Sequence, residues 1–167
     1  MQTIMITGCS SGFGLETARY FLEQGWKVIA TMRAPQEGVL PASDRLRLVR
    51  LDVTSAQSIA EAIAEVGEID VLVNNAGIYG PQDFYATDDE TWERYWQTNV
   101  MSGVRLSRAL LPGMVQKGWG RVVFISSESA CNIPADMIHY GVTKTAQLSL
   151  ARGLAKFVAG SGVTVNS

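Results

Sequence analysis

Cysteine and histidine are scarce in this chain, and their scarcity excludes several kinds of site. The 167 residues contain two cysteines, Cys9 and Cys131, and one histidine, His139. The two thiols lie far apart and form no CxxC pair, so this set cannot supply the ligands of an ordinary structural zinc site. We therefore expect no metal centre in this protein.

Long hydrophobic runs and blocks of basic residues are absent as well. No stretch of about 18 apolar residues occurs, so we expect no membrane-spanning helix. The opening MQTIMITGCSSG lacks the basic flank and long apolar run of a signal peptide. The net charge of −2 and the lack of a Lys/Arg block give no reason to expect nucleic acid or a membrane as a partner. The expected protein is soluble and cytoplasmic.

The sequence does contain a regular alternation of short apolar runs and helical patterns. An apolar fraction of 47% and a charged fraction of 18% suit one globular domain over residues 1–167. Apolar strands that alternate with helices predict an α/β fold, a doubly wound parallel sheet of Rossmann type with helices on both faces. The expected strands are 2–7, 27–32, 46–51, 69–73, 121–126 and 163–165, and the expected helices are 13–24, 55–66, 88–111 and 136–159.

Capping residues and prolines set the expected limits of these elements. Thr54 is a candidate N-cap for the helix 55–66. Pro112 is expected to end the helix 88–111, because proline interrupts the helical hydrogen bonds. The connection 33–46 contains two prolines and a glycine, so we expect a loop there with at most one helical turn.

A glycine-rich turn, TGCSSGFG, separates the first expected strand from the first expected helix. Gly8, Gly12 and Gly14 can adopt positive φ and let a ligand approach the backbone, while free N–H groups at a helix start attract phosphate. The spacing G-x-x-x-G-x-G differs from the usual G-x-G-x-x-G, and a tight turn without a ligand is the alternative. The position in the first strand–helix–strand unit, with Ser10 and Ser11, favours a dinucleotide.

The end of the second expected strand indicates which dinucleotide is bound. An acidic residue there would bind the ribose 2′-hydroxyl and repel a 2′-phosphate. This sequence has the run ATMR instead, and Arg33 can form a charge-assisted contact with a 2′-phosphate. A solvated surface arginine is the alternative. We therefore predict NADP(H), with NAD(H) as the second choice.

A serine, a tyrosine and a lysine are the strongest candidates for chemistry. Tyr140 and Lys144 have i, i+4 spacing in one expected helix, so their side chains reach the same side, and Ser127 follows an expected strand. Reduction of a carbonyl needs hydride at carbon and a proton at oxygen. A free phenol titrates near pH 10, and an adjacent ammonium favours its ionised form. Each residue alone is explained as well by packing or surface charge, but together, behind a glycine turn, they predict proton transfer.

The ordered set TGCSSGFG, NNAG, Asn99 in a helix, Ser127 and YGVTK resembles the short-chain dehydrogenase/reductase family along essentially the whole chain. The TGCSSG opening and the ATMR strand end are similar to NADP-preferring hydroxysteroid and retinol dehydrogenase-like members. Members of the family continue past the sixth strand with a substrate-covering lid and a seventh strand. We expect this chain to be a fragment without them, or to be followed by further residues. Because the lid selects the substrate, these residues do not predict it.

The resemblance implies a role for each matching residue. Asn99, Ser127, Tyr140 and Lys144 match the catalytic tetrad, with Tyr140 as the acid/base and Asn99 holding a water that links Lys144 to solvent. Ser127 is preferred to Ser126 because it lies thirteen residues before the tyrosine. The cofactor-binding residues, including Arg33 from the argument above, are Gly8, Ser10, Ser11, Gly12, Phe13, Gly14, Arg33, Asp52, Val53, Asn75, Ala76, Gly77, Tyr140 and Lys144.

The implied function is that of an NADP(H)-dependent oxidoreductase that interconverts an alcohol and a ketone or aldehyde, with a small molecule as substrate. The resemblance also implies homodimers or homotetramers, formed through the helices 88–111 and 136–159. A non-catalytic dinucleotide-binding module and a purely structural flavodoxin-like domain are the alternatives, and the complete tetrad argues against the first. Asn74 is expected to support the sheet, and His139 to face away from Tyr140. Packing or interface roles are expected for Trp92, Tyr95 and Trp96.

Overall fold

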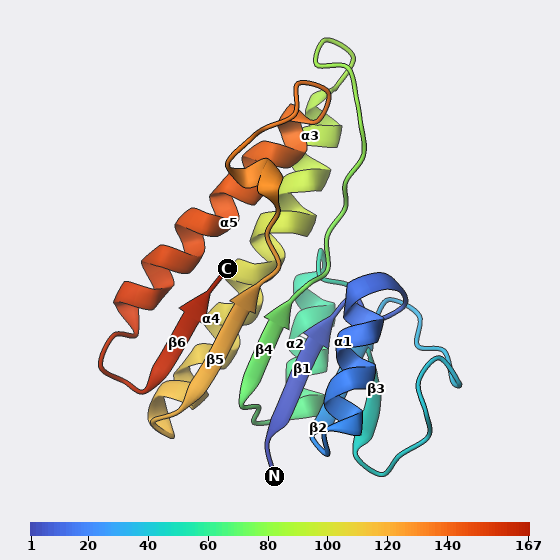
Figure 1. Cartoon of the computed structure of the whole chain (residues 1–167), viewed down its shortest axis with the longest axis vertical. Coiled ribbons are helices and arrows are strands. Elements are labelled where there is room, and N and C mark those ends of the chain that lie inside the picture. Colours follow the sequence, from blue (N-terminus) through green and yellow to red (C-terminus); the bar gives the residue numbers. More distant parts are fainter.

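The computed structural model describes residues 1–167, and its centre is one parallel β-sheet. The six strands have the order β3-β2-β1-β4-β5-β6, and every pairing is parallel (Figure 1). Helices cover parts of both faces, so the predicted Rossmann-type fold is confirmed. The strands are β1 (Thr3–Thr7), β2 (Lys27–Met32), β3 (Leu46–Arg50), β4 (Val71–Asn74), β5 (Gly120–Phe124) and β6 (Val163–Asn166); the helices are α1 (Gly12–Glu23), α2 (Ala56–Val66), α3 (Asp89–Trp96), the π-turn η1 (Gln97–Met101), α4 (Ser102–Gln116), the 3-10 turn η2 (Glu128–Ala130) and α5 (Ile138–Phe157).

The order of the strands reverses beside β1. The chain first moves outward from β1 through β2 to β3, and the connection between β2 and β3 contains no helix, as predicted. It then returns through α2 to β4, on the other side of β1, and continues outward to β6. In open parallel sheets, ligands bind at the carboxyl ends of the strands where the order reverses. That position follows Thr7 of β1 and Asn74 of β4.

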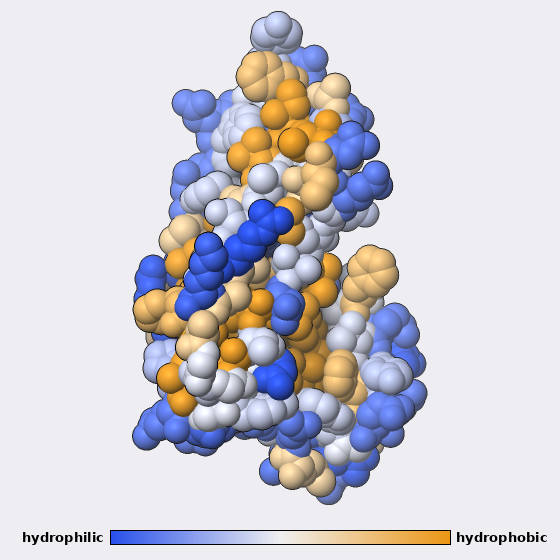
Figure 2. Space-filling view, turned by 60° about the vertical axis from the view of Figure 1, so that its left-hand side comes forward, coloured by the Kyte–Doolittle hydropathy of each residue, from blue (hydrophilic) through white to orange (hydrophobic).

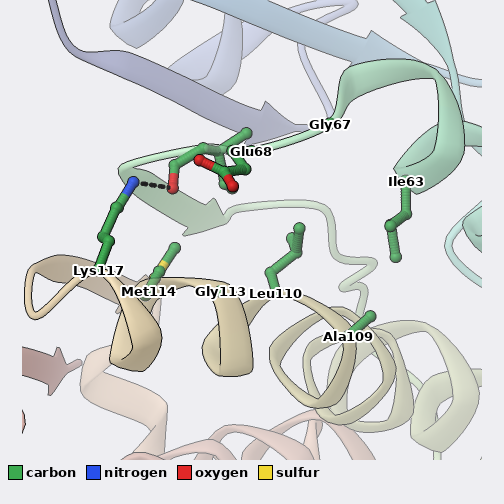
Figure 3. Close-up of a pocket in the computed structure, with 9 residues that line it drawn as sticks. Ile63, Gly67, Glu68, Ala109, Leu110, Gly113, Met114 and Lys117 are labelled. Atoms are coloured by element: carbon green, nitrogen blue, oxygen red, sulfur yellow. Dashed lines mark hydrogen bonds between the residues drawn. The ribbon is translucent and has the colours of Figure 1, made fainter.

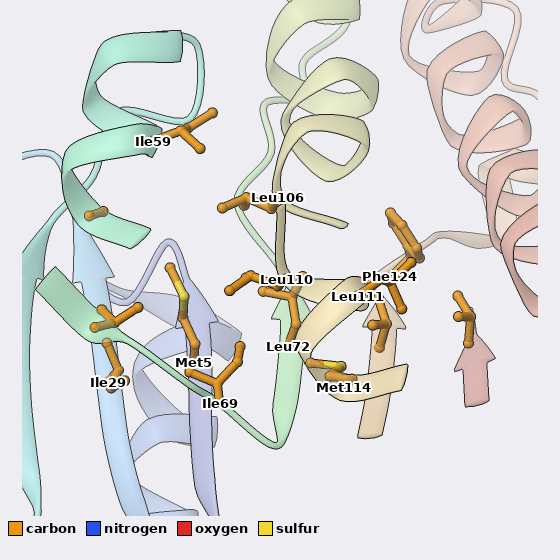
Figure 4. Close-up of a cluster of buried hydrophobic side chains, with 14 of the residues drawn as sticks. Met5, Ile29, Ile59, Ile69, Leu72, Leu106, Leu110, Leu111, Met114 and Phe124 are labelled. Atoms are coloured by element: carbon orange, nitrogen blue, oxygen red, sulfur yellow. The ribbon is translucent and has the colours of Figure 1, made fainter. Parts of the chain in front are cut away.

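Each face of the sheet packs a separate hydrophobic cluster. Alternate residues of a strand point to opposite faces, so Met5 of β1 packs on one side while Ile4 and Ile6 pack on the other. The Met5 side is covered by α2, α4 and α5, and the Ile4 side by α1. None of the helices combines the length and apolar character needed to cross a bilayer. Side chains that fill the Met5 side include Ile29, Ile59, Leu72, Leu106, Leu110 and Phe124 (Figure 4).

The start of α2 corrects the predicted cap. Ser55, not Thr54, is the N-cap, because its hydroxyl accepts a hydrogen bond from the Ser58 N–H at 3.2 Å. Thr54 instead donates its backbone N–H and its hydroxyl to the Asp52 carboxylate, at 2.9 and 2.7 Å. These local bonds commit Thr54 to the turn before the helix, so the capping role passes to the next residue.

The helix predicted over 88–111 is longer than expected and is not uniform. It consists of α3, the π-turn Gln97–Met101, and α4, which continues through Pro112 to Gln116. A proline removes one helical hydrogen bond, here the bond to the carbonyl of Arg108, but Arg108 is exposed and water can bind that carbonyl. The prediction that Pro112 ends the helix is therefore wrong.

Candidate active site

The glycine turn follows β1 at the point where the strand order reverses, and backbone geometry explains its glycines. Gly8 and Gly12 have φ of +74° and +59°, in the left-handed region. A Cβ on Gly14 would lie 2.3 Å from the Gly8 carbonyl oxygen, so α1 can begin this close to the turn only because residue 14 has no side chain. A Cβ on Gly12 would meet nothing within 4 Å. The turn is tightly packed at Gly8 and Gly14 and open at Gly12.

The N-terminus of α1 offers backbone donors to a ligand. The N-cap residue, Ser11, makes no side-chain hydrogen bond to the first turn, and that turn contains no acidic residue. Ser10 and Phe13 are exposed beside it. Uncapped N–H groups at the positive end of a helix dipole suit a phosphate. The turn and the helix start therefore fit the pyrophosphate of a dinucleotide.

Thr7 and Asn75 tie the loop after β4 to the glycine turn. The Thr7 hydroxyl oxygen accepts from the backbone N–H groups of Asn75 and Ala76, at 3.0 and 2.9 Å. The Asn75 amide donates to the carbonyls of Thr7 and Gly8, at 2.8 and 3.3 Å. Asn74, predicted to support the sheet, is buried and pairs through its backbone with β5. The structure therefore brings the glycine turn and the NNAG segment into direct contact.

The carboxyl ends of β2 and β3 carry the residues predicted to meet the adenosine. Arg33 is exposed and forms no ion pair within 4.0 Å. Hydrogen bonds from Thr54 hold the pKa of Asp52 below its usual value, and the charges of Arg33 and Arg50 lower this pKa further. Val53 is buried next to it.

Tyr140 and Lys144 lie side by side on α5. The Lys144 ammonium nitrogen is 5.5 Å from the centroid of the Tyr140 ring. Lys144 is 5% exposed, and burial lowers the pKa of its ammonium to about 8. The ammonium donates to the Ile125 carbonyl at 2.8 Å and to the Gln147 amide oxygen at 3.3 Å. Because both acceptors are neutral, they hold the positive charge beside the phenol without cancelling it.

Asn99 lies in the π-turn, 1% exposed, and uses its whole amide. Its Oδ1 accepts from the Ile78 N–H at 2.8 Å, and its Nδ2 donates to the Ile78 carbonyl at 2.9 Å and the Thr143 hydroxyl at 3.0 Å. The backbone carbonyl of Asn99 accepts from the Gln147 amide at 2.5 Å. The Thr143 hydroxyl in turn donates to the Tyr140 carbonyl at 2.7 Å. Asn99 therefore joins the loop after β4 to α5.

Gly77 completes the contact between this loop and the lysine. A Cβ on Gly77 would lie 3.3 Å from Asn99 Oδ1 and 3.8 Å from the Lys144 ammonium nitrogen. At residue 77, only backbone therefore lies beside the Asn99 amide oxygen and the Lys144 ammonium. Gly77 itself is exposed, so a ligand can reach this point from solvent.

Ser127 stands just beyond β5, where the 3-10 turn η2 begins. It is partly buried, and its hydroxyl oxygen accepts from the Ser129 N–H at 3.1 Å. The start of α5 packs closely on this segment, because a Cβ on Gly141 would lie 2.5 Å from Ile133 Cγ2 and 3.0 Å from the Ser129 carbonyl oxygen. This close packing brings Ser127 and Tyr140 to the same edge of the sheet.

Two loops, 75–88 and 131–137, border this edge of the sheet (Figure 1). The Gln82 N–H donates to the Asp136 carbonyl at 2.7 Å and joins them. The Tyr79 ring lies 6.3 Å from the Tyr140 ring, between centroids. Figure 2 shows hydrophobic surface at this end of the molecule, where α3 and α5 extend beyond the strands. The large exposed hydrophobic side chains of the two loops are Tyr79, Phe84, Tyr85 and Ile133.

His139 packs against α3 rather than toward the tyrosine and lysine. Its ring lies edge-on to Tyr95 at 4.3 Å and to Trp92 at 6.2 Å, between centroids. Burial lowers the pKa of its imidazole, and the charge of Arg94 lowers it further. Trp92, Tyr95 and His139 therefore form a packing contact between α3 and α5, which leaves Tyr140 to face the site.

A separate hollow of about 250 Å³ lies between the C-terminal parts of α2 and α4 (Figure 3). It is at the amino ends of the strands, so it lies at the opposite edge of the sheet from Tyr140. Lys117 at its rim donates to the Ile69 carbonyl at 2.7 Å and forms an ion pair with Asp70. None of the predicted site residues lines it. The hollow is not part of the candidate active site.

Three residues of the site were not predicted: Thr7, Thr143 and Gln147. Thr7 and Thr143 act as hydrogen-bonding links between segments far apart in the chain. Gln147 lies one helical turn after Lys144, so the helical spacing that paired Tyr140 with Lys144 was a usable signal for it. The two threonines had no comparable signal, because their partners are defined only by the folded chain.

Comparison with known proteins agrees with this architecture. A Rossmann-type sheet with a glycine turn at the point where the strand order reverses is the architecture of dinucleotide-binding α/β proteins. The family model described as short chain dehydrogenase matches residues 2–167. The uncharacterized oxidoreductase YvaG of Bacillus subtilis (strain 168) is 38% identical over 175 residues, which cover 99% of this chain and 66% of YvaG. The chain belongs to the short-chain dehydrogenase family.

Solved structures give the same picture. A short-chain dehydrogenase from Streptomyces avermitilis superposes with a TM-score of 0.93 at 37% identity, over 99% of this chain and 64% of that one. The closed form of a serine dehydrogenase complexed with NADP+ gives a TM-score of 0.91 at 33% identity, over 99% of this chain and 70% of that one. The chain therefore spans about two thirds of the length of the relatives it matches.

Proposed function

We propose that the chain carries the cofactor-binding and catalytic residues of an NADP(H)-dependent oxidoreductase that interconverts an alcohol and a ketone or aldehyde. The observation that carries this proposal is the position of the Tyr140 phenol beside the buried ammonium of Lys144. This pair lies on the same edge of the sheet as an uncapped helix N-terminus that fits a pyrophosphate. Family membership supports the general reaction.

The proposed cofactor residues follow the carboxyl edge of the sheet. The pyrophosphate would be held by the glycine turn, the adenosine by the residues after β3 and β4, and the nicotinamide ribose by Tyr140 and Lys144. When bound, the nicotinamide supplies or accepts the hydride. The residues concerned are Gly8, Ser10, Ser11, Gly12, Phe13, Gly14, Arg33, Asp52, Val53, Asn75, Ala76, Gly77, Tyr140 and Lys144.

The proton is handled by the residues of the chain itself. In the reducing direction the Tyr140 hydroxyl donates its proton to the substrate oxygen, and in the oxidising direction the phenolate accepts it. The Lys144 ammonium stabilises the phenolate by its charge. Ser127 donates a hydrogen bond to the same substrate oxygen and stabilises the charge that develops there. Asn99 holds the π-turn and the loop after β4 in place around this group.

Arg33 supports NADP(H) over NAD(H). It is exposed and has no ion-pair partner within the chain, so its guanidinium is available to a 2′-phosphate. The serine dehydrogenase that this chain resembles is described in complex with NADP+. The narrower likeness to hydroxysteroid and retinol dehydrogenases stays a prediction, as does a cytoplasmic location.

We also propose that residues 1–167 form one domain. The protein associates into a homodimer or homotetramer through its long helices. Trp92 and Trp96 line a hollow of about 380 Å³ on α3, and Trp96 and Val142 are exposed on α3 and α5. An exposed aromatic helix face of this kind is typical of interfaces. Light scattering of the purified protein tests it, and a monomer at micromolar concentration would contradict it.

The test of the proposed function is the replacement Tyr140→Phe. It removes only the hydroxyl, so we expect turnover with a panel of aldehydes and ketones to fall by about 10³-fold. The dissociation constant for NADPH should rise by less than about tenfold, because only one hydrogen bond to the cofactor is lost and the other cofactor-binding residues remain. Tyr20→Phe, an exposed tyrosine on α1, is the matched control. Normal turnover in Tyr140→Phe, or nucleotide binding by the wild type without reduction of any carbonyl, would contradict the proposal.

A further inference from the structure

Gln147 carries an amide that is buried at the centre of the candidate site. The residue lies on α5, one turn after Lys144, and is 3% exposed. Its Nε2 donates to the backbone carbonyl of Asn99 at 2.5 Å, and its Oε1 accepts from the Lys144 ammonium at 3.3 Å. One side chain therefore bridges the π-turn and the lysine, with both halves of the amide used.

We propose that Gln147 is a positioning residue for the Lys144 ammonium. An ammonium has three N–H donors. Two are directed to neutral acceptors, the Ile125 carbonyl and the Gln147 oxygen, which leaves one for the space shared with Tyr140. The hydrogen bond to Asn99 fixes the amide, so its oxygen, rather than its nitrogen, faces the lysine. The significance of this arrangement for catalysis rests on the proposed function, whereas the bridge itself does not.

The bridge also bears on the charge of the lysine. An ammonium that is removed from water needs hydrogen-bond acceptors to remain charged, and the pKa of Lys144 is already lowered to about 8 by burial. The groups in contact with it are the Tyr140 ring and two neutral acceptors, the Ile125 carbonyl and the Gln147 amide oxygen, and no carboxylate lies within 4.0 Å of it. The Gln147 oxygen therefore helps to keep the charged form populated near neutral pH. A carboxamide does not ionise near neutral pH, so the Gln147 oxygen accepts this hydrogen bond without taking up the proton of the lysine.

A merely structural link between α5 and the π-turn is the alternative, and two variants separate the two roles. Gln147→Met keeps the length of the side chain and removes both hydrogen bonds. Gln147→Glu keeps an oxygen toward Lys144, adds a negative charge and loses the donor to Asn99. A structural role predicts lower stability in both variants and an unchanged lysine titration. A positioning role predicts opposite shifts of that titration.

The measurement is a titration of ¹³C-labelled lysine side chains by NMR in the protein without nucleotide. The signals are few, because the lysines are Lys27, Lys117, Lys144 and Lys156. We expect the titration midpoint of Lys144 to fall by about one pH unit in Gln147→Met. The reason is that the free energy of one hydrogen bond to a charged group corresponds to a pKa shift of about this size. In Gln147→Glu we expect it to rise by about one unit or more. Gln57→Leu, on the exposed side of α2, is the control and should leave it unchanged.

Kinetics give a second reading that separates this proposal from the proposed function. In Gln147→Met, the alkaline limb of the kcat profile against pH should move down with the lysine midpoint, while KM for NADPH changes little. A lysine midpoint that stays at the wild-type value in both Gln147 variants overturns the role of Gln147, even if the protein is an active reductase. A shifted midpoint in a protein that reduces no carbonyl upholds the bridge and overturns only the proposed function.

Discussion

The glycine turn over residues 8–14 and the site around Tyr140 and Lys144 are built in different ways. The glycine turn is made by backbone: positive φ at Gly8 and Gly12, a missing Cβ at Gly14 and uncapped N–H groups. The second site is made by side chains that hold one another through hydrogen bonds between distant segments. A change in the first should therefore alter the fold near β1, whereas a change in the second should alter charge and chemistry with little change in fold.

The strongest way to test the backbone half of this comparison is Gly14→Ala. The added Cβ would lie 2.3 Å from the Gly8 carbonyl oxygen, so the start of α1 must move. We expect the free energy of unfolding to fall by about 3 kcal/mol, as for other overpacked positions, and NADPH binding to be lost. Urea denaturation and fluorescence titration measure the two effects.

Gly153→Ala is the matched control for that change. Residue 153 lies within α5, and a Cβ there would meet nothing within 4 Å. This variant should be more stable than the wild type by about 0.5–1 kcal/mol, because alanine is the better helix former. Similar losses of stability in both glycine variants would mean that the packing of the turn is not what requires Gly14.

Lys144→Met tests the side-chain half of the comparison through stability and pH. The folded-state pKa of about 8 lies below the ordinary value of 10.5, so the folded chain pays to keep this lysine charged below pH 8. Replacement should raise the free energy of unfolding by about 2 kcal/mol at pH 7, since lost hydrogen bonds offset part of the gain, and should abolish turnover.

The sign of the pH dependence follows from proton binding. Between pH 8 and 10.5 the unfolded chain binds more protons at this residue than the folded chain, so this contribution to stability rises with pH. The gain in the free energy of unfolding that Lys144→Met gives over the wild type should therefore be largest below pH 8 and decrease toward zero near pH 10.5. Denaturation of both proteins across that range measures it, and a difference that is independent of pH would contradict the burial of a charged lysine.

Arg33→Ala is expected to have the smallest effect, because the side chain is exposed. The dissociation constant for NADPH should rise by about tenfold, and that for NADH should not change, since only the former carries a 2′-phosphate. Arg152→Ala, an exposed arginine on α5, is the control. If NADPH and NADH respond alike to Arg33→Ala, the arginine is only a surface charge.

The same contrast explains which features could be predicted from the sequence. The strands, α1, α2 and the glycine turn follow from local patterns, and the structure agrees with them to within one or two residues. The π-turn at Asn99 and the passage of α4 through Pro112 depend on packing against α5 and on solvent at Arg108, which local patterns do not report. Residue spacing found Tyr140 and Lys144, but the bonds that Asn99 makes to segments 21 and 44 residues away required the fold.

Gly141 has a consequence for how this scaffold can vary. Because a side chain at this position would collide with Ile133 and with the Ser129 carbonyl, the start of α5 rests directly on the segment after Ser127. The contact of Gly141 with Ile133 and the Ser129 carbonyl therefore sets the spacing between Ser127 and Tyr140, although it involves the side chain of neither. The parts of the two loops that make none of these contacts, residues 79–88 and 134–137, can then change in length and composition, and with them the shape presented to a substrate, while the reacting groups keep their separation.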